Sequence, residues 1–327
     1  MYLEQLRSFC AVIDQGSYTR AARQLSLTQP AVSQHVRSLE QLFGIPLVQR
    51  VGGRMQPTEA GEAIYRHAAE ILAQADAMRS AVLALKGLQG GRVTIGASPS
   101  VGNYLLPQIV VRFRRRYPGV SVQMFIDKGS RVFEQVLRGA VDFGIALGYQ
   151  VPRGLHTEPL FCEPVVLVVS PSHPIVRRWP KGIPRAALAG LPLVALPAQT
   201  AISRRLCDEW LREAGVEPRI EMEFDTTESI KRVVAGGIGG AFLFANSVAL
   251  DVAAGQLTIL PVVDGSLCAQ FVVAGRQQQY FTPAARAFLE AAVAGLQENR
   301  LVSNVNTNVV KQFMHYKGSA EHRARLA

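Results

Sequence analysis

The chain has 327 residues, too many for one ordinary domain, and its hydrophobic content of 48% is ample for sizeable cores. Its 35 Lys and Arg against 25 Asp and Glu give a formal net charge of +10, which favours polyanionic partners without identifying one. Apolar runs such as residues 165–169 are far too short to cross a bilayer, and no signal peptide is apparent, so we expect no membrane role.

The cysteines and histidines give no sign of a metal site. The four cysteines lie far apart without a CxxC pair, which predicts neither a disulfide framework nor a zinc site and fits a reducing cytoplasm. The six histidines show no ligand spacing either. We therefore expect a cytoplasmic protein with no metal and no cofactor.

The first 57 residues predict three short helices and a hairpin. Apolar residues at helical spacing run from Leu3 to Ile13, where Gly16 ends the first helix. A second short helix follows Ser17, and a third begins after Thr28 as N-cap. Residues 47–50 and 54–56 then read as a small hairpin around a Gly-Gly turn, which is typical of the wing beside a helix-turn-helix.

The third helix hides an apolar stripe and leaves a polar face that suits DNA. Gln can pair with adenine and Arg with guanine or phosphate, whereas arginines on the wing suit phosphates or the minor groove. The alternative, a solvated polar face, is less favoured because the turn, the wing and the following rod occur in order. His35 and Glu40 are expected in solvent. The predicted DNA contacts are Thr28, Gln29, Pro30, Ser33, Gln34, Arg37, Arg50 and Arg54.

One long helix is predicted from Thr58 to about Leu88, followed by a glycine-rich linker to residue 91. Its apolar positions alternate in steps of four and three, the repeat of a coiled-coil seam. The alternative is an amphipathic helix packed on its own domain. The predicted dimerisation residues are Ile64, Ala68, Ile71, Ala75, Met78, Val82 and Leu85.

From residue 92 the pattern changes to strands alternating with helices, in two series that predict two α/β lobes with mainly parallel sheets. The first series has strands at 92–97, 120–126 and 142–147, with helices at 101–117 and 131–137. The second has strands at 193–196, 220–224 and 240–244, with helices at 202–214 and 228–235. A last helix is expected at 283–296, and residues 298–327 read as a flexible extension.

A small-molecule cleft is expected beyond the carboxyl ends of these strands, where helix N-termini favour anions. Lys128 could neutralise a carboxylate or phosphate there. The alternative is that Ser98 and Thr227 are helix caps and Lys128 is a solvated surface charge. The predicted effector contacts are Ser98, Pro99, Ser100, Lys128, Gln199, Thr200, Thr226 and Thr227.

Two stretches resemble enzyme motifs, but each departs from its motif, so we expect no enzyme. Residues 96–100 resemble a nucleophile elbow but end in Ser100 rather than glycine. The glycines at 237–240 follow a helix and precede a strand, the reverse of a dinucleotide loop. Cys162 and Cys268 fall where the chain should cross between the lobes. The two interpretations are a redox pair and two small buried hydrophobic residues. The second is favoured because no basic partner supports a thiolate.

The chain resembles the LysR-type transcriptional regulators over residues 1–297. The most specific match is LEQLRSFCAVIDQGSYTRAARQLSLTQPAVSQHVRSLEQLFGIPLVQR at 3–50, followed by PTEAG at 57–61. Weaker matches are RYPGV at 116–120, GAVDFGIA at 139–146 and VVAGGIGGAFL at 233–243. The tail beyond residue 297 departs from the family.

The resemblance implies a winged helix-turn-helix at 1–57, a dimerising linker helix and hinge at 58–91, and a periplasmic-binding-protein-like effector domain at 92–297. Its lobe 1 would comprise 92–161 with 268–297, and its lobe 2 residues 162–267. It further implies a homodimer or homotetramer that binds inverted-repeat DNA near promoters. Such a protein switches transcription when a small, anionic metabolite binds, and it acts through RNA polymerase if it is an activator. The remaining alternative is a small-molecule-binding protein without a DNA role.

Overall fold

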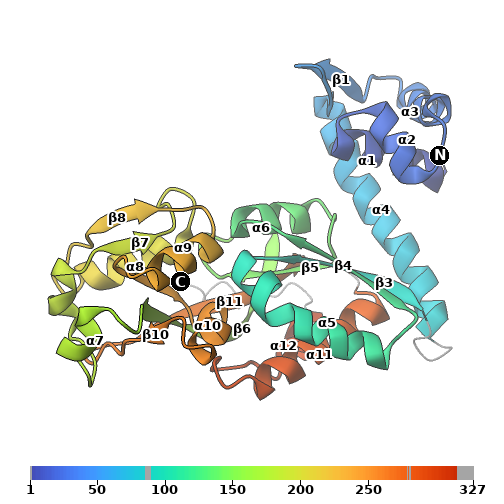
Figure 1. Ribbon diagram of the computed structural model, residues 1–327. Helices are drawn as coiled ribbons and strands as arrows, with labels where there is room; N and C mark the ends of the chain where they lie inside the picture. The colour runs from blue at the N-terminus through green and yellow to red at the C-terminus, as the bar shows by residue number, and fades with distance from the viewer. Residues whose placement is uncertain (1, 85–89, 278, 280, 315–327) are drawn as a thin grey trace.

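The structure is a computed structural model that describes residues 2–84, 90–277, 279 and 281–314 (Figure 1). It contains a small N-terminal domain, a long helix and a two-lobed α/β domain, in that order along the chain. The predicted dimerisation residue Leu85 and the glycine of the linker at position 87 lie outside the described residues.

The N-terminal domain is a winged helix built around one apolar core. Its elements are α1 (Leu3–Gln15), α2 (Tyr18–Leu25), α3 (Gln29–Phe43) and the antiparallel pair β1 (Val48–Val51) and β2 (Arg54–Pro57). The side chain of Ser17 caps α2, and that of Thr28 caps α3, the cap that the sequence predicts there. Leu6, Phe9, Val32, Val36 and Leu39 are at most 1% exposed, which shows that the inward stripe of α3 meets α1.

Helix α4 (Glu59–Ala84) connects the two domains. Its 26 residues span about 39 Å at 1.5 Å per residue. Figure 1 shows that its start lies against the winged helix and its far end reaches the edge of the α/β domain near β3. The helix is therefore part of the N-terminal core at one end and meets the α/β domain at the other.

One continuous sheet runs through both lobes in the order β4-β3-β5-β11-β6-β9-β7-β8. In lobe 1, β3 (Gly91–Ala97), β4 (Val120–Ile126) and β5 (Phe143–Leu147) are parallel. In lobe 2, β7 (Leu193–Ala195), β8 (Ile220–Glu223) and β9 (Gly240–Phe244) are parallel, and β10 (Thr258–Ile259) pairs with β6. All six predicted strands are therefore confirmed close to their predicted bounds.

Two long antiparallel strands join the lobes: β6 (Leu155–Val169) and β11 (Leu267–Arg276). Each pairs with its own lobe's sheet on one side, β11 with β5 and β6 with β9. Neither strand was predicted from the sequence. Both lack the polar-apolar alternation of a half-exposed strand because most of their residues are buried on both faces.

Helices cover both faces of each lobe. In lobe 1, the π-helical turn Val101–Leu105 (η1), α5 (Leu106–Arg116) and α11 (Pro283–Glu298) lie on one face and α6 (Gly129–Leu137) on the other. In lobe 2, α8 (Ile202–Arg212) covers one face and α9 (Thr227–Ala235) with α10 (Ala245–Ala253) the other. Short helices at Pro174–Arg178 (α7) and Arg185–Gly190 (η2) complete lobe 2.

The prediction that the tail is flexible is wrong for residues 299–314. This segment, which we call the strap, runs along β6 and ends in α12 (Val309–Met314). Ser303 exchanges two backbone hydrogen bonds of 2.8 Å with Cys162, and the backbone N–H of Asn306 donates to the carbonyl of Leu160 at 2.8 Å. Val309 and Phe313 are 0% and 1% exposed in the core of lobe 1. Those two residues are four positions apart, the spacing of apolar residues on one face of a helix, but the polar asparagines before them hide this pattern in the sequence.

Candidate functional site

The polar face of α3 lies open on the surface of the winged helix. Thr28, Gln29, Pro30, Gln34 and Arg37 are exposed, and Ser33 is half-buried between them. These side chains occupy the first turns of the helix, opposite the buried row of Val32, Val36 and Leu39. A helix that is held by one face and presents Gln, Ser and Arg on the other can enter a major groove.

His35 and Glu40, expected in solvent, have structural roles instead. The Nδ1 atom of His35 lies 2.7 Å from the hydroxyl oxygen of the fully buried Ser8, which joins α3 to α1. The Oε1 atom of Glu40 accepts hydrogen bonds from the backbone N–H groups of Leu47 and Val48, at 2.9 and 3.3 Å. Glu40 thus fixes the first strand of the wing against α3, which the sequence could not show because the contact depends on a turn between them.

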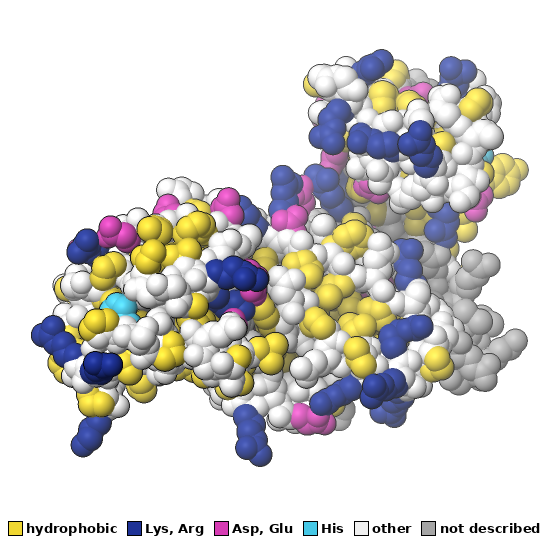
Figure 2. Space-filling model, viewed as in Figure 1, with side chains coloured by type: hydrophobic (Ala, Val, Ile, Leu, Met, Phe, Trp, Pro, Cys, Tyr) yellow, Lys and Arg dark blue, Asp and Glu magenta, His cyan; other side chains and the backbone are white. Residues whose placement is uncertain are grey.

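The wing has the predicted geometry. Gly52 and Gly53 have φ angles of 56° and 79°, the positive values that a two-residue hairpin turn of type I′ requires. Arg50 and Arg54 are exposed on either side of this turn and form no ion pair with any described residue. Figure 2 shows Lys and Arg side chains spread over the winged helix at the upper right. The wing therefore offers free cations beside the open face of α3.

The predicted seam of α4 has two fates. Ala68 is 1% exposed and Ile64 half-buried, and both pack in the winged-helix core, where Tyr65 donates a hydrogen bond of 2.5 Å to Asp14. The prediction that Ala68 lines a dimer seam is therefore wrong: its side chain is already covered within the chain. Ile71 and Met78 are 39% and 70% exposed and Ala75 half-buried, and the side chain of Val82 lies outside the described part.

A cleft of about 480 Å³ lies between the lobes, at the carboxyl ends of β3, β4 and β5. Seven of the eight predicted effector residues line it; the exception is Gln199, which is exposed on the turn before α8. Its apolar wall was not predicted, because these residues come from several strands, from α8 and from the loop after β7, in both lobes. That wall includes Ile126, Leu147, Val165, Leu196, Ile202 and Phe244.

On the lobe 1 side, polar groups face the cleft without protein partners. Ser98 is 7% exposed, and its hydroxyl oxygen makes no hydrogen bond among the described residues. Lys128 is exposed at the N-terminus of α6 and forms no ion pair within the described ranges. The close packing of η1 on β4 shapes this rim, because a Cβ atom at Gly102 would lie 2.7 Å from Ile126.

On the lobe 2 side, Thr226 and Glu228 are already engaged by protein partners. The hydroxyl of Thr226 accepts the backbone N–H of Ser229 at 3.2 Å, so Thr226 caps α9, whereas the alternative expectation placed this cap at Thr227. Lys231 lies 2.8 Å from Glu228 and 2.8 Å from Asp251. Thr227, the first residue of α9, completes this rim.

A hydrogen bond of 2.7 Å from the hydroxyl of Tyr104, on η1, to Glu228, on α9, joins the two lobes at the cleft. Burial, and then this hydrogen bond, raises the pKa of Tyr104. Although burial acts to raise it, the hydrogen bonds from Lys231 and Tyr104 lower the pKa of Glu228. Neither residue was predicted, because they are 124 positions apart and meet only when the lobes close.

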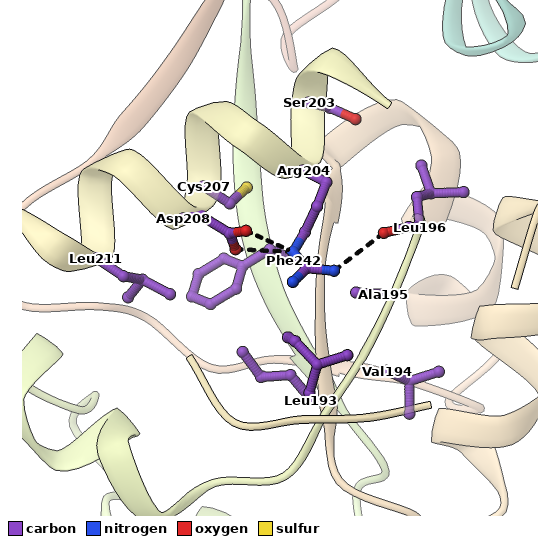
Figure 3. Close-up of a pocket in the computed structure, with 11 residues that line it drawn as sticks. Leu193, Val194, Ala195, Leu196, Ser203, Arg204, Cys207, Asp208, Leu211 and Phe242 are labelled. Atoms are coloured by element: carbon purple, nitrogen blue, oxygen red, sulfur yellow. Dashed lines mark hydrogen bonds and ion pairs between the residues drawn. The ribbon is translucent and has the colours of Figure 1, made fainter. Parts of the chain in front are cut away.

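Arg204 anchors the start of α8 beneath the cleft (Figure 3). Its Nε atom lies 2.7 and 2.9 Å from the two carboxylate oxygens of Asp208, and an Nη1 hydrogen bond of 3.1 Å reaches the carbonyl of Leu196. The cavity around this pair has a volume of only about 20 Å³, room for a single water. It is therefore a structural joint that holds the cleft residues Thr200 and Ser203 in place.

Cys162 and Cys268 are bonded as a disulfide between β6 and β11, with Cα atoms 5.9 Å apart. The expectation that both are small buried hydrophobic residues is wrong for Cys268, which is exposed, whereas Cys162 is 8% exposed. Among the described residues no three His, Cys, Asp or Glu gather in a metal-binding arrangement. In the same part of the chain no helix is long and apolar enough to span a bilayer.

Comparisons with known proteins match both domains. The family described as "Bacterial regulatory helix-turn-helix protein, lysR family" matches residues 3–62, and "LysR substrate binding domain" matches residues 86–297. A "Probable RuBisCO transcriptional regulator" of Cyanophora paradoxa is 34% identical over 295 residues, covering 88% of this chain and 90% of that protein.

Two solved structures share the fold. A full-length OxyR variant from Pseudomonas aeruginosa is 23% identical with a TM-score of 0.74, covering 94% of this chain and 99% of that one. Full-length CbnR in complex with its target DNA is 21% identical with a TM-score of 0.60, covering 90% of this chain and 100% of that one.

Proposed function

Because the chain belongs to the LysR family of bacterial transcriptional regulators, we propose that it reads an inverted-repeat DNA site through α3 and the wing of two paired subunits. The protein is a ligand-responsive DNA-binding regulator and not an enzyme. In this proposal a small anionic metabolite in the cleft changes the geometry of the paired heads, and with it the contact to RNA polymerase, in the cytoplasm.

The open polar face of α3 carries the DNA part of the proposal. Gln29, Ser33 and Arg37 follow one another at four-residue spacing, so they project in one row along the helix. Arg37 forms no ion pair with a described residue and is free to grip guanine or phosphate. Arg50 and Arg54 supply phosphate or minor-groove contacts that set the position of the head without reading sequence.

Pairing through α4 supplies the two-fold symmetry. Ile71 and Met78 are exposed one seam repeat apart on the half of the helix that leaves the winged-helix core. Large exposed apolar side chains on a free helix face are suited to a second copy of the helix. Two heads related in this way contact half-sites separated by about one helical turn of DNA or a multiple of it.

The cleft chemistry suits a small molecule with an apolar body and one anionic end. The volume of about 480 Å³ lies within the range of metabolite pockets. Lys128 and the hydroxyl of Ser98 would hold the anion, because both lack protein partners among the described residues. Phe244, Ile126 and Leu147 would cover the apolar part.

A gel shift with the DNA upstream of the protein's own gene tests the DNA function. A RuBisCO promoter is the second probe, because relatives that are 34% identical to this chain are described as probable RuBisCO transcriptional regulators. Arg37→Ala is expected to weaken specific binding by about 1–3 kcal/mol, roughly 5- to 150-fold, if the contact is bidentate. Arg178→Ala, an exposed arginine on α7 of lobe 2, is the control and leaves binding unchanged.

Two outcomes would reject the proposal. Equal affinity for every DNA sequence would remove sequence reading by α3. Metabolite binding without any DNA binding would instead favour the remaining alternative, a small-molecule-binding protein whose N-terminal helices only oligomerise.

A further inference from the structure

We propose that Cys162 and Cys268 form a reversible thiol–disulfide site that couples low-molecular-weight disulfides to the crossover between the lobes. This inference does not depend on the identity of the cleft ligand. It rests on the positions of the two sulfurs, on the strap that pairs with the backbone of Cys162, and on the contrast with the other two cysteines of the chain.

The two cysteines lie on the strands that connect the lobes. Cys162 pairs with Gln270 in the β6–β11 register and Cys268 with Pro164, so the two cysteines are diagonal neighbours on one face of the sheet. Their sulfurs are bonded in the structure. A covalent link here joins the two crossover strands directly, and any rotation of lobe 1 against lobe 2 must pass through these strands.

The two sulfurs differ in access, as an attacking and a resolving thiol do. Cys268 is exposed, with its sulfur 3.9 Å from the hydroxyl oxygen of Ser303. Cys162 is 8% exposed, and its backbone pairs with the strap through two hydrogen bonds with Ser303. A solution oxidant therefore reaches Cys268 first, and Cys162 is held at bonding distance behind it.

Cys10 and Cys207, the other two cysteines, are unsuited to this chemistry. Both are buried, and burial, followed by a neighbouring acidic residue, raises the pKa of each to about 12. The thiolate is the reactive form, so these two cysteines stay protonated and unreactive. They serve as internal controls on the same chain.

The reaction is thiol–disulfide exchange with a disulfide such as oxidised glutathione. The thiolate of Cys268 attacks one sulfur of the oxidant, and its other half leaves as a thiolate that takes up the proton lost by Cys268. Cys162, losing its proton, then attacks the sulfur of Cys268 in the mixed disulfide and releases a second thiol. Two cysteine thiols are oxidised to one disulfide, and one small disulfide is reduced to two thiols.

Alkylation and mass spectrometry of the native full chain test the site, with glutathione as the probe. Reduced glutathione is expected to expose two alkylatable thiols at 162 and 268, and oxidised glutathione to remove both again. Cys162→Ser should accumulate one glutathione adduct on Cys268, whereas Cys268→Ser should show at least tenfold slower labelling at Cys162. Cys207→Ser is the control and behaves as the unchanged chain does.

Hydrogen exchange of the same samples tests the consequence for the crossover. Amides of β6, β11 and the strap should exchange several-fold faster in the reduced protein, with no change in the winged helix. A bond that reduced glutathione cannot open in the native protein, or thiols that oxidised glutathione leaves free, would overturn the proposal. Equal rates of labelling at the two cysteines would overturn it as well. So would hydrogen exchange that is identical in the reduced and oxidised protein.

Discussion

The two sides of the inter-lobe cleft are built in opposite ways. Lobe 1 brings the hydroxyl of Ser98 and the ammonium of Lys128 to the cleft without partners among the described residues. Lobe 2 has charged groups at and beside the cleft that are tied to each other: Arg204 to Asp208, and Glu228 to Lys231. Unsatisfied polar groups gain most from a ligand, whereas satisfied ones resist rearrangement. Lobe 1 thus supplies affinity and lobe 2 a fixed surface to close against.

Breaking the rigid side should give the largest effect. Arg204→Ala leaves the carboxylate of Asp208, 8% exposed, without its cation, which costs about 3–5 kcal/mol of unfolding free energy for a buried pair. Chemical denaturation measures this loss. Arg212 is the last residue of the helix that carries Arg204, and it forms an exposed ion pair with Glu217. Arg212→Ala should therefore cost no more than about 1 kcal/mol of unfolding free energy. Equal losses in both variants would mean that lobe 2 is not the rigid side.

The crossover between the two sides should respond to pH through Glu163. Burial raises the pKa of this carboxyl to about 7, although Asn246 donates two hydrogen bonds to its Oε1 atom. The folded chain thus keeps a proton that the unfolded chain releases near pH 4.3, so stability falls as the pH rises through about 7. The full loss at pH 8 is about 4 kcal/mol, since one pKa unit corresponds to about 1.4 kcal/mol.

Glu163→Gln removes the buried charge and should therefore stabilise the protein at pH 8 but not at pH 4. Thermal denaturation at the two pH values measures the difference. Glu213→Gln, at an exposed position, is the control and should leave the pH profile unchanged. A variant whose stability falls with pH as steeply as the unchanged chain would contradict the assignment to Glu163.

Changing the open side should give the smallest effect on the protein alone and a visible one with ligand. Lys128→Ala should leave the unfolding free energy within about 0.5 kcal/mol, because the lysine has no partner to lose. It should reduce the thermal shift produced by small carboxylates or phosphates, with a loss of about 1.5–3 kcal/mol in binding. Lys181→Ala, exposed in lobe 2, is the matched control. Unchanged thermal shifts in Lys128→Ala would place the anion elsewhere.

The sequence predicted the DNA-reading helix and the parallel strands of both lobes well, because these depend on local spacing, but it missed the long crossover strands β6 and β11. The face of α3 follows from the period of Val32, Val36 and Leu39, and the turn of the wing follows from two adjacent glycines. The ends of the strands also placed most of the cleft, since parallel strands end at a common edge.

What the sequence could not show depends on contacts between distant segments. Tyr104 and Glu228 meet only across the closed lobes, and Glu40 reaches the wing through a turn. The apolar spacing of α4 has the same period whether it faces a partner or its own core, so Ala68 was assigned to the wrong surface. The polar composition around Asn306 hid the strap, whose burial depends on the open edge of β6.

The strap also orders events while the protein is being made. Lobe 2 is one contiguous stretch of chain, so it can condense soon after it emerges from the ribosome. Lobe 1 needs Val309 and Phe313 to fill its interior, and these residues are synthesised more than 160 positions after β5 has left the ribosome. The nascent polypeptide therefore carries a finished DNA-reading head well before its metabolite-sensing half is complete.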